Sequence, residues 1–325
     1  MGRMKRFVQI AKRDDFMSII SILVMVVVLT LTSSDIFWSS SNISSLSYTI
    51  SRNVIVAFGM MMVMICGYFD LSVGNIMLLS SLVSASVIQM GGTTIIAILA
   101  GLISGLLAGA LNGLLVAVVG VNALIATIGT QYIFYGIGMT VYDYAKQVKL
   151  LPDSFIAVSS NKLLGVEYYV WCALILFIVF SIYMSYNKKG RQLYYIGGNK
   201  EAAKQMGYPF KKSLFTCYMI LGLLAAVAGI FAMARIKNPS QNVGMDLHMT
   251  CIIACIVGGG SFAGGKGRMT GALFGIIFIS LLSNMFNIWE VKSMYQNLTL
   301  GLVLVAVLTL DGWMNIKRLR SLGKI

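Results

Sequence analysis

The sequence predicts an all-α protein, a polytopic bundle of about ten membrane-spanning helices with broken or re-entrant glycine-rich segments. Of its 325 residues 58% are apolar and 11% are charged, and the mean hydropathy is +0.84. A soluble core cannot bury that much apolar surface. Apolar stretches of about 15–25 residues divide almost the whole chain, and this length crosses a hydrocarbon layer of roughly 30 Å. We therefore expect residues 1–325 to form a single transmembrane domain.

Ten apolar stretches justify this expectation in order. They cover residues 17–37, 53–67, 72–89, 94–119, 122–142, 168–186, 213–233, 249–263, 268–287 and 293–311. The first stretch follows a basic arm and lacks a small-residue cleavage site, which indicates a retained span and not a removed signal. Between Asn53 and Ala145 the only charged residues are Asp70 and Asp143, so no soluble domain fits there.

Lys and Arg are concentrated on one side of the expected topology. If the N-terminus lies in the cytoplasm, 18 of the 25 cations fall in cytoplasmic segments and 7 in external ones. Because these residues are retained inside during insertion, both termini are expected to be cytoplasmic. Orientation and anionic lipid headgroups explain the net charge of +14, so membrane lipid and no nucleic acid is the expected partner. Cys251 and Cys255 have no His or acidic companion at ligand spacing, and no metal site is expected.

Two glycine-rich breaks interrupt the apolar stretches. The segment GGGSFAGGKGRMTG at 258–271 resembles a nucleotide-phosphate loop, but Gly267 stands where that loop needs Ser or Thr. Gly267, Gly271 and Gly275 instead recur every fourth residue at the start of a span, a spacing that predicts one close-packed helix face. We expect a tight turn or re-entrant element at the cytoplasmic side, where protein or water surrounds the broken backbone.

The second break, CGYFDLSVGN at 66–75, carries an acid between two spans. Asp70 or Ser72 is expected either to cap the following helix or pair structurally, or to take a direct part in transport, since an acid near the membrane is often functional.

The fourth stretch carries glycines at a strict spacing of four, which predicts a helix face that meets a neighbouring backbone closely. These glycines are Gly101, Gly105, Gly109 and Gly113. Nearby amides at Asn112, Asn122 and Gln131 either line a polar route or form hydrogen bonds between helices. With Asp70 and Ser72 they make up the candidate pathway residues.

The loop 187–212 is predicted to contain its own short helix, from Lys200 to Met206. Asn199 is of a residue type favoured at helix N-caps, and the negative charge of Glu201 is favourable in the first turn. Gly207 suits the left-handed position after the last turn.

A helix of about two turns is marginal alone in water and must be held by the protein or by a partner. The small side chains of Ala202 and Ala203 permit close docking.

Several motifs together carry a family resemblance. GGNKEAAKQMG at 197–207 resembles the cytoplasmic loop of permease subunits in bacterial ATP-binding-cassette (ABC) importers of ribose, galactose, xylose and related sugars. FDLSVG at 69–74, NALIATIGT at 122–130, GRQLYYIGGN at 190–199 and GGGSFAGGKG at 258–267 resemble that family too, in the same order. Tyr68 and Phe69 depart from the family, which more often has Gly-Ile or Gly-Met there.

The resemblance implies a translocation subunit that is not itself an enzyme, lies in the bacterial inner membrane and imports a small sugar by alternating access. Its implied partners are a second permease chain (homodimer or heterodimer), two ABC ATPase domains and an extracytoplasmic solute-binding protein. No cofactor is expected on this chain, because the partner ATPases use ATP and Mg. The 199–207 helix, with Asn199, Glu201, Ala202, Ala203 and Gly207, would sit in a groove of the ATPase.

Three alternatives stay open at this point. Permeases for nucleosides or for branched-chain amino acids share this organisation by family analogy. A secondary transporter is disfavoured, because such proteins commonly place ionisable residues within their spans for ion coupling and this chain has almost none.

Overall fold

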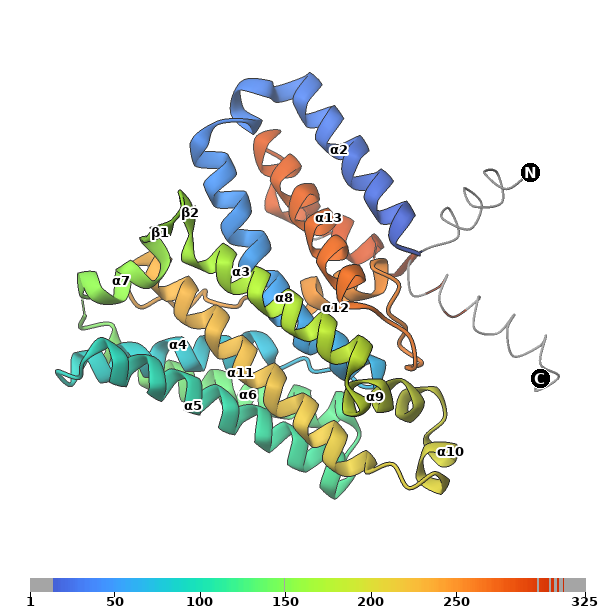
Figure 1. Ribbon diagram of the computed structural model, residues 1–325. Helices are drawn as coiled ribbons and strands as arrows, with labels where there is room; N and C mark the ends of the chain where they lie inside the picture. The colour runs from blue at the N-terminus through green and yellow to red at the C-terminus, as the bar shows by residue number, and fades with distance from the viewer. Residues whose placement is uncertain are drawn as a thin grey trace, which may run out of the picture.

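The computed structural model describes residues 14–148, 150–296, 298–303, 305–306, 309 and 312. Figure 1 labels its elements. The helices are α2 (Asp14–Phe37), α3 (Ser40–Ile65), α4 (Val73–Gln89), α5 (Thr94–Gly113), the π-helix η1 (Leu114–Val119), α6 (Ala123–Ala145), α7 (Asp153–Ser160), α8 (Tyr168–Tyr186), α9 (Lys188–Gly198), α10 (Lys200–Gln205), α11 (Phe210–Ile236), α12 (Leu247–Val257) and α13 (Met269–Ile288). A two-stranded antiparallel hairpin, β1 (Lys162–Leu163) and β2 (Val166–Glu167), pairs Lys162 with Glu167.

Within the described residues, seven helical segments are long and apolar enough to cross a membrane. They are Ser18–Phe37, Ser40–Ile65, Thr94–Val119, Ala123–Ala145, Tyr168–Tyr186, Phe210–Ile236 and Met269–Ile288. The apolar helices α4 and α12 are shorter, with 17 and 11 residues. The expected class, a polytopic helical membrane protein, is confirmed. The tenth expected stretch, 293–311, lies partly outside the described residues.

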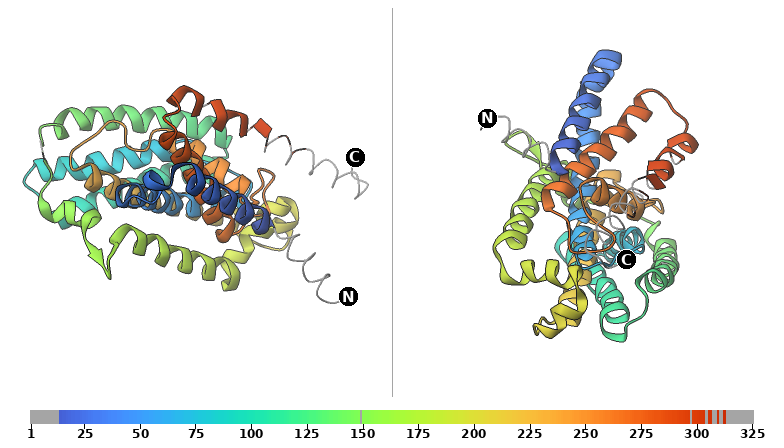
Figure 2. Two further views of the ribbon diagram at one scale, coloured as in Figure 1. Left: turned by 90° about the horizontal axis from the view of Figure 1, so that it is seen from above. Right: turned by 90° about the vertical axis from the view of Figure 1, so that its right-hand side faces the viewer.

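The core of the bundle surrounds α11. This helix packs against α3, α4 and α5, and Figure 1 shows it running beside α5 along the bundle. Every residue of α3 from Asn53 to Ile65 is buried, whereas α2 and α8 expose rows of large aliphatic side chains. The two views in Figure 2 show α9 and α10 gathered at one end of the bundle. We call this the α10 end.

Glycines from both helices bring α5 and α11 to backbone distance. A β-carbon on Gly105 would lie 2.6 Å from the carbonyl oxygen of Gly222, and one on Gly109 would overlap the carbonyl of Tyr218. The Gly101 end of the same face meets Ser84 and Ser80 of α4, and Gly113 meets Phe215. No sequence signal had marked Gly222 as the facing residue.

The expected face of Gly267, Gly271 and Gly275 is corrected in part. Gly271 and Gly275 lie on α13, where a β-carbon would overlap the carbonyls of Gly258 and Ala254. Gly267 precedes the helix with φ +142°, a value that a helix cannot contain. It packs instead against Met61 of α3. The spacing of four was therefore coincidental at its first position.

Candidate functional site

The two glycine-rich breaks lie against each other at the α10 end. The Gly265 N–H donates to the Ile65 carbonyl at the end of α3, over 2.8 Å. Gly67 and Gly264, with φ +83° and +80°, turn the two chains where a β-carbon on Gly264 would lie 2.8 Å from Gly67 Cα. The Phe69 and Phe262 rings meet edge to face at 5.5 Å. Residues 65–69 and 262–265, almost 200 positions apart, thus form one contact region, which we call the joint.

The end of α9 is the third part of this joint. Gly197 lies so close that a β-carbon would overlap the Ile65 carbonyl and come within 2.7 Å of the Gly265 nitrogen. The Tyr194 hydroxyl donates to the Gly267 carbonyl over 3.0 Å. Burial raises the pKa of Tyr194 above its ordinary value, so its hydroxyl remains a donor. The adjacent Gly198 has nothing within 4 Å of a β-carbon.

Local capping builds α10 next to this joint. Asn199 accepts a hydrogen bond from the Ala202 N–H at 3.0 Å, and Gly207 takes φ +75° after the last turn. Ala203 is 0% exposed, so the close docking that its small side chain permits takes place within this chain, beside α9. Glu201, Lys204 and Gln205 of α10 are exposed, and Met206, which follows the helix, is 56% exposed.

Lys200 connects α10 to the first break. Its ammonium lies 3.4 Å from the Tyr68 hydroxyl and 4.4 Å from the centre of the Phe210 ring at the start of α11. A cation over an aromatic face is held by the ring quadrupole. Sequence reasoning missed Lys200, and the only signal for Tyr68 was its departure from the family pattern.

Asp70 lies at the centre of a fully buried polar cluster. One carboxylate oxygen accepts from the Ser72 N–H at 2.8 Å and from the Ser72 hydroxyl at 2.7 Å, and the other accepts from the Asn112 amide at 2.8 Å. The same Asn112 nitrogen lies 2.7 Å from the Ser72 hydroxyl oxygen. Donated hydrogen bonds stabilise the ionised carboxylate and oppose the cost of burying it. The cluster ties the first break to α5.

Tyr218 ties the same break to α11. Its hydroxyl donates to the Phe69 carbonyl over 2.9 Å, and its side chain is fully buried. The five residues from Tyr68 to Ser72 therefore touch α10, α11 and α5 in turn.

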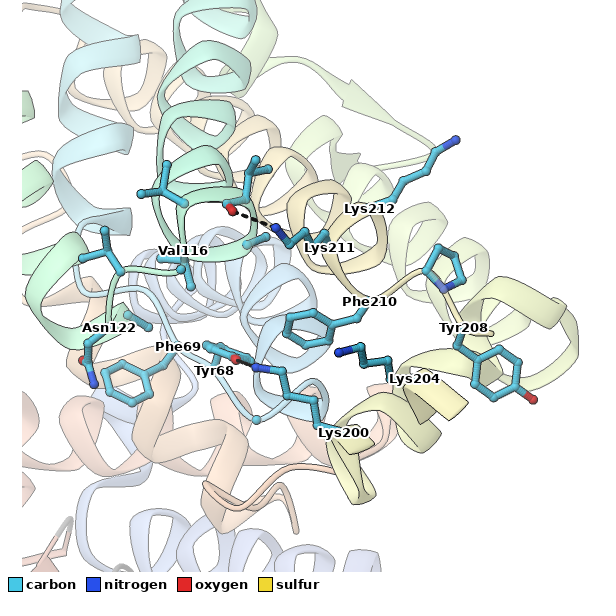
Figure 3. Close-up of a pocket in the computed structure, with 18 of the residues that line it drawn as sticks. Tyr68, Phe69, Val116, Asn122, Lys200, Lys204, Tyr208, Phe210, Lys211 and Lys212 are labelled. Carbon is cyan, nitrogen blue, oxygen red and sulfur yellow. Dashed lines mark hydrogen bonds between the residues drawn. The ribbon is translucent and has the colours of Figure 1, made fainter. Parts of the chain in front are cut away.

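A cleft of about 1100 Å³ opens beside the break. Its walls come from residues 67–69, from η1 and the start of α6 at 116–124, from α10, and from residues 208–212. Four lysines and one glutamate line it: Lys200, Lys204, Lys211, Lys212 and Glu201. Figure 3 shows the ammonium groups of Lys200, Lys204 and Lys211 turned toward the same space, while Lys212 turns outward.

Comparison with known proteins decides the class of this molecule. The family described as branched-chain amino acid transport system / permease component matches residues 42–308. The chain belongs to this permease family.

Three relatives show which permeases are similar to it. The ribose import permease RbsC of Escherichia coli is 32% identical over 298 residues, or 90% of this permease and 92% of the relative. From the same organism, the L-arabinose transport system permease AraH is 30% identical over 83% and 82% of the two chains, and the D-allose transport system permease AlsC is 29% identical over 92% and 91%. The resemblance drawn from motifs is confirmed. No solved structure matches this permease significantly.

The permease brings together three of its five candidate pathway residues. Asp70, Ser72 and Asn112 form the buried cluster, whereas Asn122 caps α6 by accepting from the Leu124 N–H at 2.9 Å and lines the cleft. The contact found for Gln131 is made by its backbone carbonyl, which accepts a hydrogen bond from the Asn75 side chain over 2.8 Å. Asn75 had not been predicted.

Of the two structural roles expected for Asp70 and Ser72, the cap of α4 is wrong and the pairing is found. Ser72 occupies the N-cap position without a side-chain bond to the helix, and its hydroxyl donates to Asp70 instead. Asp70 accepts from the Ser72 N–H, which precedes the helix. The Ser72 hydroxyl is taken up by Asp70 because a fully buried carboxyl group needs hydrogen-bond partners of its own. In the described part of the permease, no three His, Cys, Asp or Glu residues are grouped to hold a metal ion.

Proposed function

We propose that this permease is the membrane subunit of an ABC importer that moves a small monosaccharide into the cytoplasm by alternating access. The observation that carries the proposal is similarity along more than four fifths of the chain to permeases for ribose, arabinose and allose. The family description mentions branched-chain amino acids, but these relatives favour a pentose or a hexose over an amino acid or a nucleoside.

In this proposal α10 receives the motion of partner ATPase domains, which bind ATP and Mg, while the permease holds no cofactor. Asn199 and Gly207 set the two ends of α10, and Glu201, Ala202 and Ala203 lie between them. The exposed side around Met206 faces the ATPase, and buried Ala203 transmits movement to α9. Lys200 and Tyr68 pass the movement to the first break, from which Asp70 reaches Asn112 on α5.

The Gly-packed pair α5 and α11 then moves as one unit between inward-open and outward-open arrangements. Because the backbones of the two helices already touch, they resist deformation against each other and shift as one packed body. The pair is connected to the break twice, through Asn112 and through Tyr218, which supports its assignment as the moving element.

The α10 end is assigned to the cytoplasm of a bacterial inner membrane. Nine described cations lie there, in 187–212 and at Lys266 and Arg268, and the positive-inside rule favours this orientation. Both termini then lie inside. A second permease chain completes the pathway, and the solute-binding protein docks at the opposite end, near α7 and the β-hairpin.

Purification of the permease with its ATPase and binding protein tests the proposal. ATPase activity should rise when pentoses or hexoses are added with the binding protein, and should not rise with nucleosides or amino acids. Stimulation by leucine or a nucleoside alone would replace the sugar assignment. Uptake into vesicles that contain the permease without any ATPase would refute the ABC mechanism itself.

A further inference from the structure

Four lysines and one glutamate line the cleft beside α10, so its described lining keeps a net positive charge. Among the described residues, none of the ammonium groups of Lys200, Lys204 and Lys211 lies within 4.0 Å of a carboxylate oxygen. Lys200 has a tyrosine hydroxyl and an aromatic ring as neighbours, and the Lys211 ammonium donates to the Val118 carbonyl over 3.1 Å. These neutral groups orient the lysines without cancelling their charge.

The cleft is continuous with apolar surface on two spans. Val118, Val119 and Leu124 line it and are 43%, 66% and 44% exposed. Leu107, Leu111 and Leu114 of α5 and η1 are exposed too, and their spacing places them on one helix face that leads away from the cleft. On α6 the exposed Ile125 and Ile128 follow Leu124. A ligand that combines an anionic head with a long apolar tail would match both surfaces.

We propose that this cleft binds the headgroup of an anionic phospholipid of the cytoplasmic leaflet. Its phosphodiester would lie among Lys200, Lys204 and Lys211, and its acyl chains would lie along the exposed faces of α5 and α6. Basic pockets beside membrane spans at the cytoplasmic side are suited to such headgroups. A soluble phosphoester matches the lysines but leaves the apolar rows without a partner.

The volume of the cleft agrees with this ligand. At about 1100 Å³ it slightly exceeds the usual size of sites for single small molecules, as a bulky ligand requires. Asn122 borders the same space, and its side-chain oxygen accepts from the Leu124 N–H, which leaves its amide nitrogen as the donor for a headgroup. A lipid there would contact α10, α6 and η1 at once.

Native mass spectrometry of the purified full chain tests the site. The protein is reconstituted in nanodiscs of dioleoylphosphatidylcholine with or without dioleoylphosphatidylglycerol, then released and its retained lipids counted. The wild type should keep phosphatidylglycerol in preference to phosphatidylcholine. The variant Lys204→Gln/Lys211→Gln should keep at least about five-fold less phosphatidylglycerol. Each basic residue near an anionic membrane surface strengthens lipid binding by a factor of about that size.

Two matched controls accompany this variant. Lys188→Gln/Lys189→Gln removes the same charge from exposed positions on α9 that do not line the cleft, and should retain lipid like the wild type. Lys204→Arg/Lys211→Arg keeps the charge and should also retain it. Equal lipid retention in Lys204→Gln/Lys211→Gln and the wild type overturns the proposal, as does equal loss in the α9 variant.

A competition arm separates a lipid from a soluble ligand. Millimolar glycerol 3-phosphate or inorganic phosphate should not displace phosphatidylglycerol from the wild type, because neither has chains to occupy the apolar rows. Displacement by either would assign the cleft to a soluble phosphoester and overturn the lipid assignment. Because the readout is a count of bound lipid, it does not depend on the transport function proposed above.

Discussion

The Asn112 side chain of α5 donates a hydrogen bond to the Asp70 carboxylate over 2.8 Å, and both residues are 0% exposed. This contact joins a broken segment to a helix 42 positions away in the sequence. Among the described residues the second amide atom, Asn112 Oδ1, is buried without a partner, so the pairing with Asp70 accounts for the orientation of the side chain.

We expect the two side chains to be exchangeable but not separately removable. Asn112→Asp places a second carboxylate against Asp70 and should abolish folded protein or uptake. Asp70→Asn/Asn112→Asp restores one acid and one amide and should recover part of both. Asn112→Leu leaves acceptors unpaired and should lower the free energy of unfolding by about 1–3 kcal/mol. Thermal unfolding in detergent and uptake measure these effects, and no recovery in the exchange variant would contradict the pairing.

Adjacent glycines provide a matched test of the joint between α9 and the breaks. Gly197→Ala should lower the thermal unfolding temperature and expose residues 198–209 to protease, because its β-carbon would overlap the Ile65 carbonyl. Gly198→Ala should behave like the wild type, since nothing lies within 4 Å of its β-carbon. Equal behaviour of the two variants would argue against the close approach seen at Gly197.

A second glycine pair tests the packing of α5. Gly109→Leu forces α5 away from Tyr218 and Gly222, so we expect a loss of folded yield and a destabilisation of about 1–3 kcal/mol or more. Gly129→Leu on α6 is the control, because a β-carbon there meets nothing within 4 Å in this chain. Size-exclusion profiles and unfolding temperatures give the readout. A Gly109→Leu protein with a single size-exclusion peak and an unchanged unfolding temperature would refute the close packing of α5 against α11.

Tyr68 and Lys200 should act together in coupling. Tyr68→Phe keeps the ring and removes the hydroxyl. Lys200→Gln removes the ammonium group that contacts both the Tyr68 hydroxyl and the Phe210 ring. We expect each variant to reduce solute-stimulated ATPase activity a few-fold, and the double variant to be no worse than Lys200→Gln, since contacting residues are not additive. Basal ATPase activity is the internal control. Strictly multiplicative losses would show that the contact carries no coupling.

The two sides of α10 should respond differently to a charge. Ala203→Asp places a carboxylate in a fully buried site and should lower the unfolding temperature of the permease itself. Met206→Asp, at a position that is 56% exposed, should leave that temperature unchanged but weaken co-purification of the ATPase. Leu163→Asp, at a position of β1 that is 53% exposed and lies near the opposite end, is the matched exposed control and should leave both the unfolding temperature and ATPase co-purification unchanged. Retention of the ATPase by Met206→Asp would exclude this side as the docking face.

Hydropathy predicted most of the spans closely, because lipid requires long apolar helices whatever their neighbours are. The stretch expected at 168–186 is α8, and that expected at 268–287 is α13 within one residue at each end. The start of α3 was missed by 13 residues, since Ser40–Arg52 is rich in polar side chains and carries no membrane signal. The amphipathic α9 was missed for the same reason.

The candidate site was predicted in pieces. The cap at Asn199 and the left-handed Gly207 were read from local chemistry, and the structure places both as expected. The role of Lys200 was not predicted, because its partners Tyr68 and Phe210 lie in other segments.

By itself, the sequence determined the membrane class, the order of the spans, the two glycine-rich breaks and the ends of α10. These features depend on hydropathy and on backbone preferences within a few residues. Only the tertiary structure decided that the two breaks meet, that Ala203 faces inward and that Asp70 pairs with Asn112 and leaves α4 without a side-chain cap. These partners are selected by packing between segments far apart in the chain. A buried acceptor such as Asp70 forms hydrogen bonds with the donors that this packing brings to it, including a hydroxyl that local sequence assigns to a helix cap.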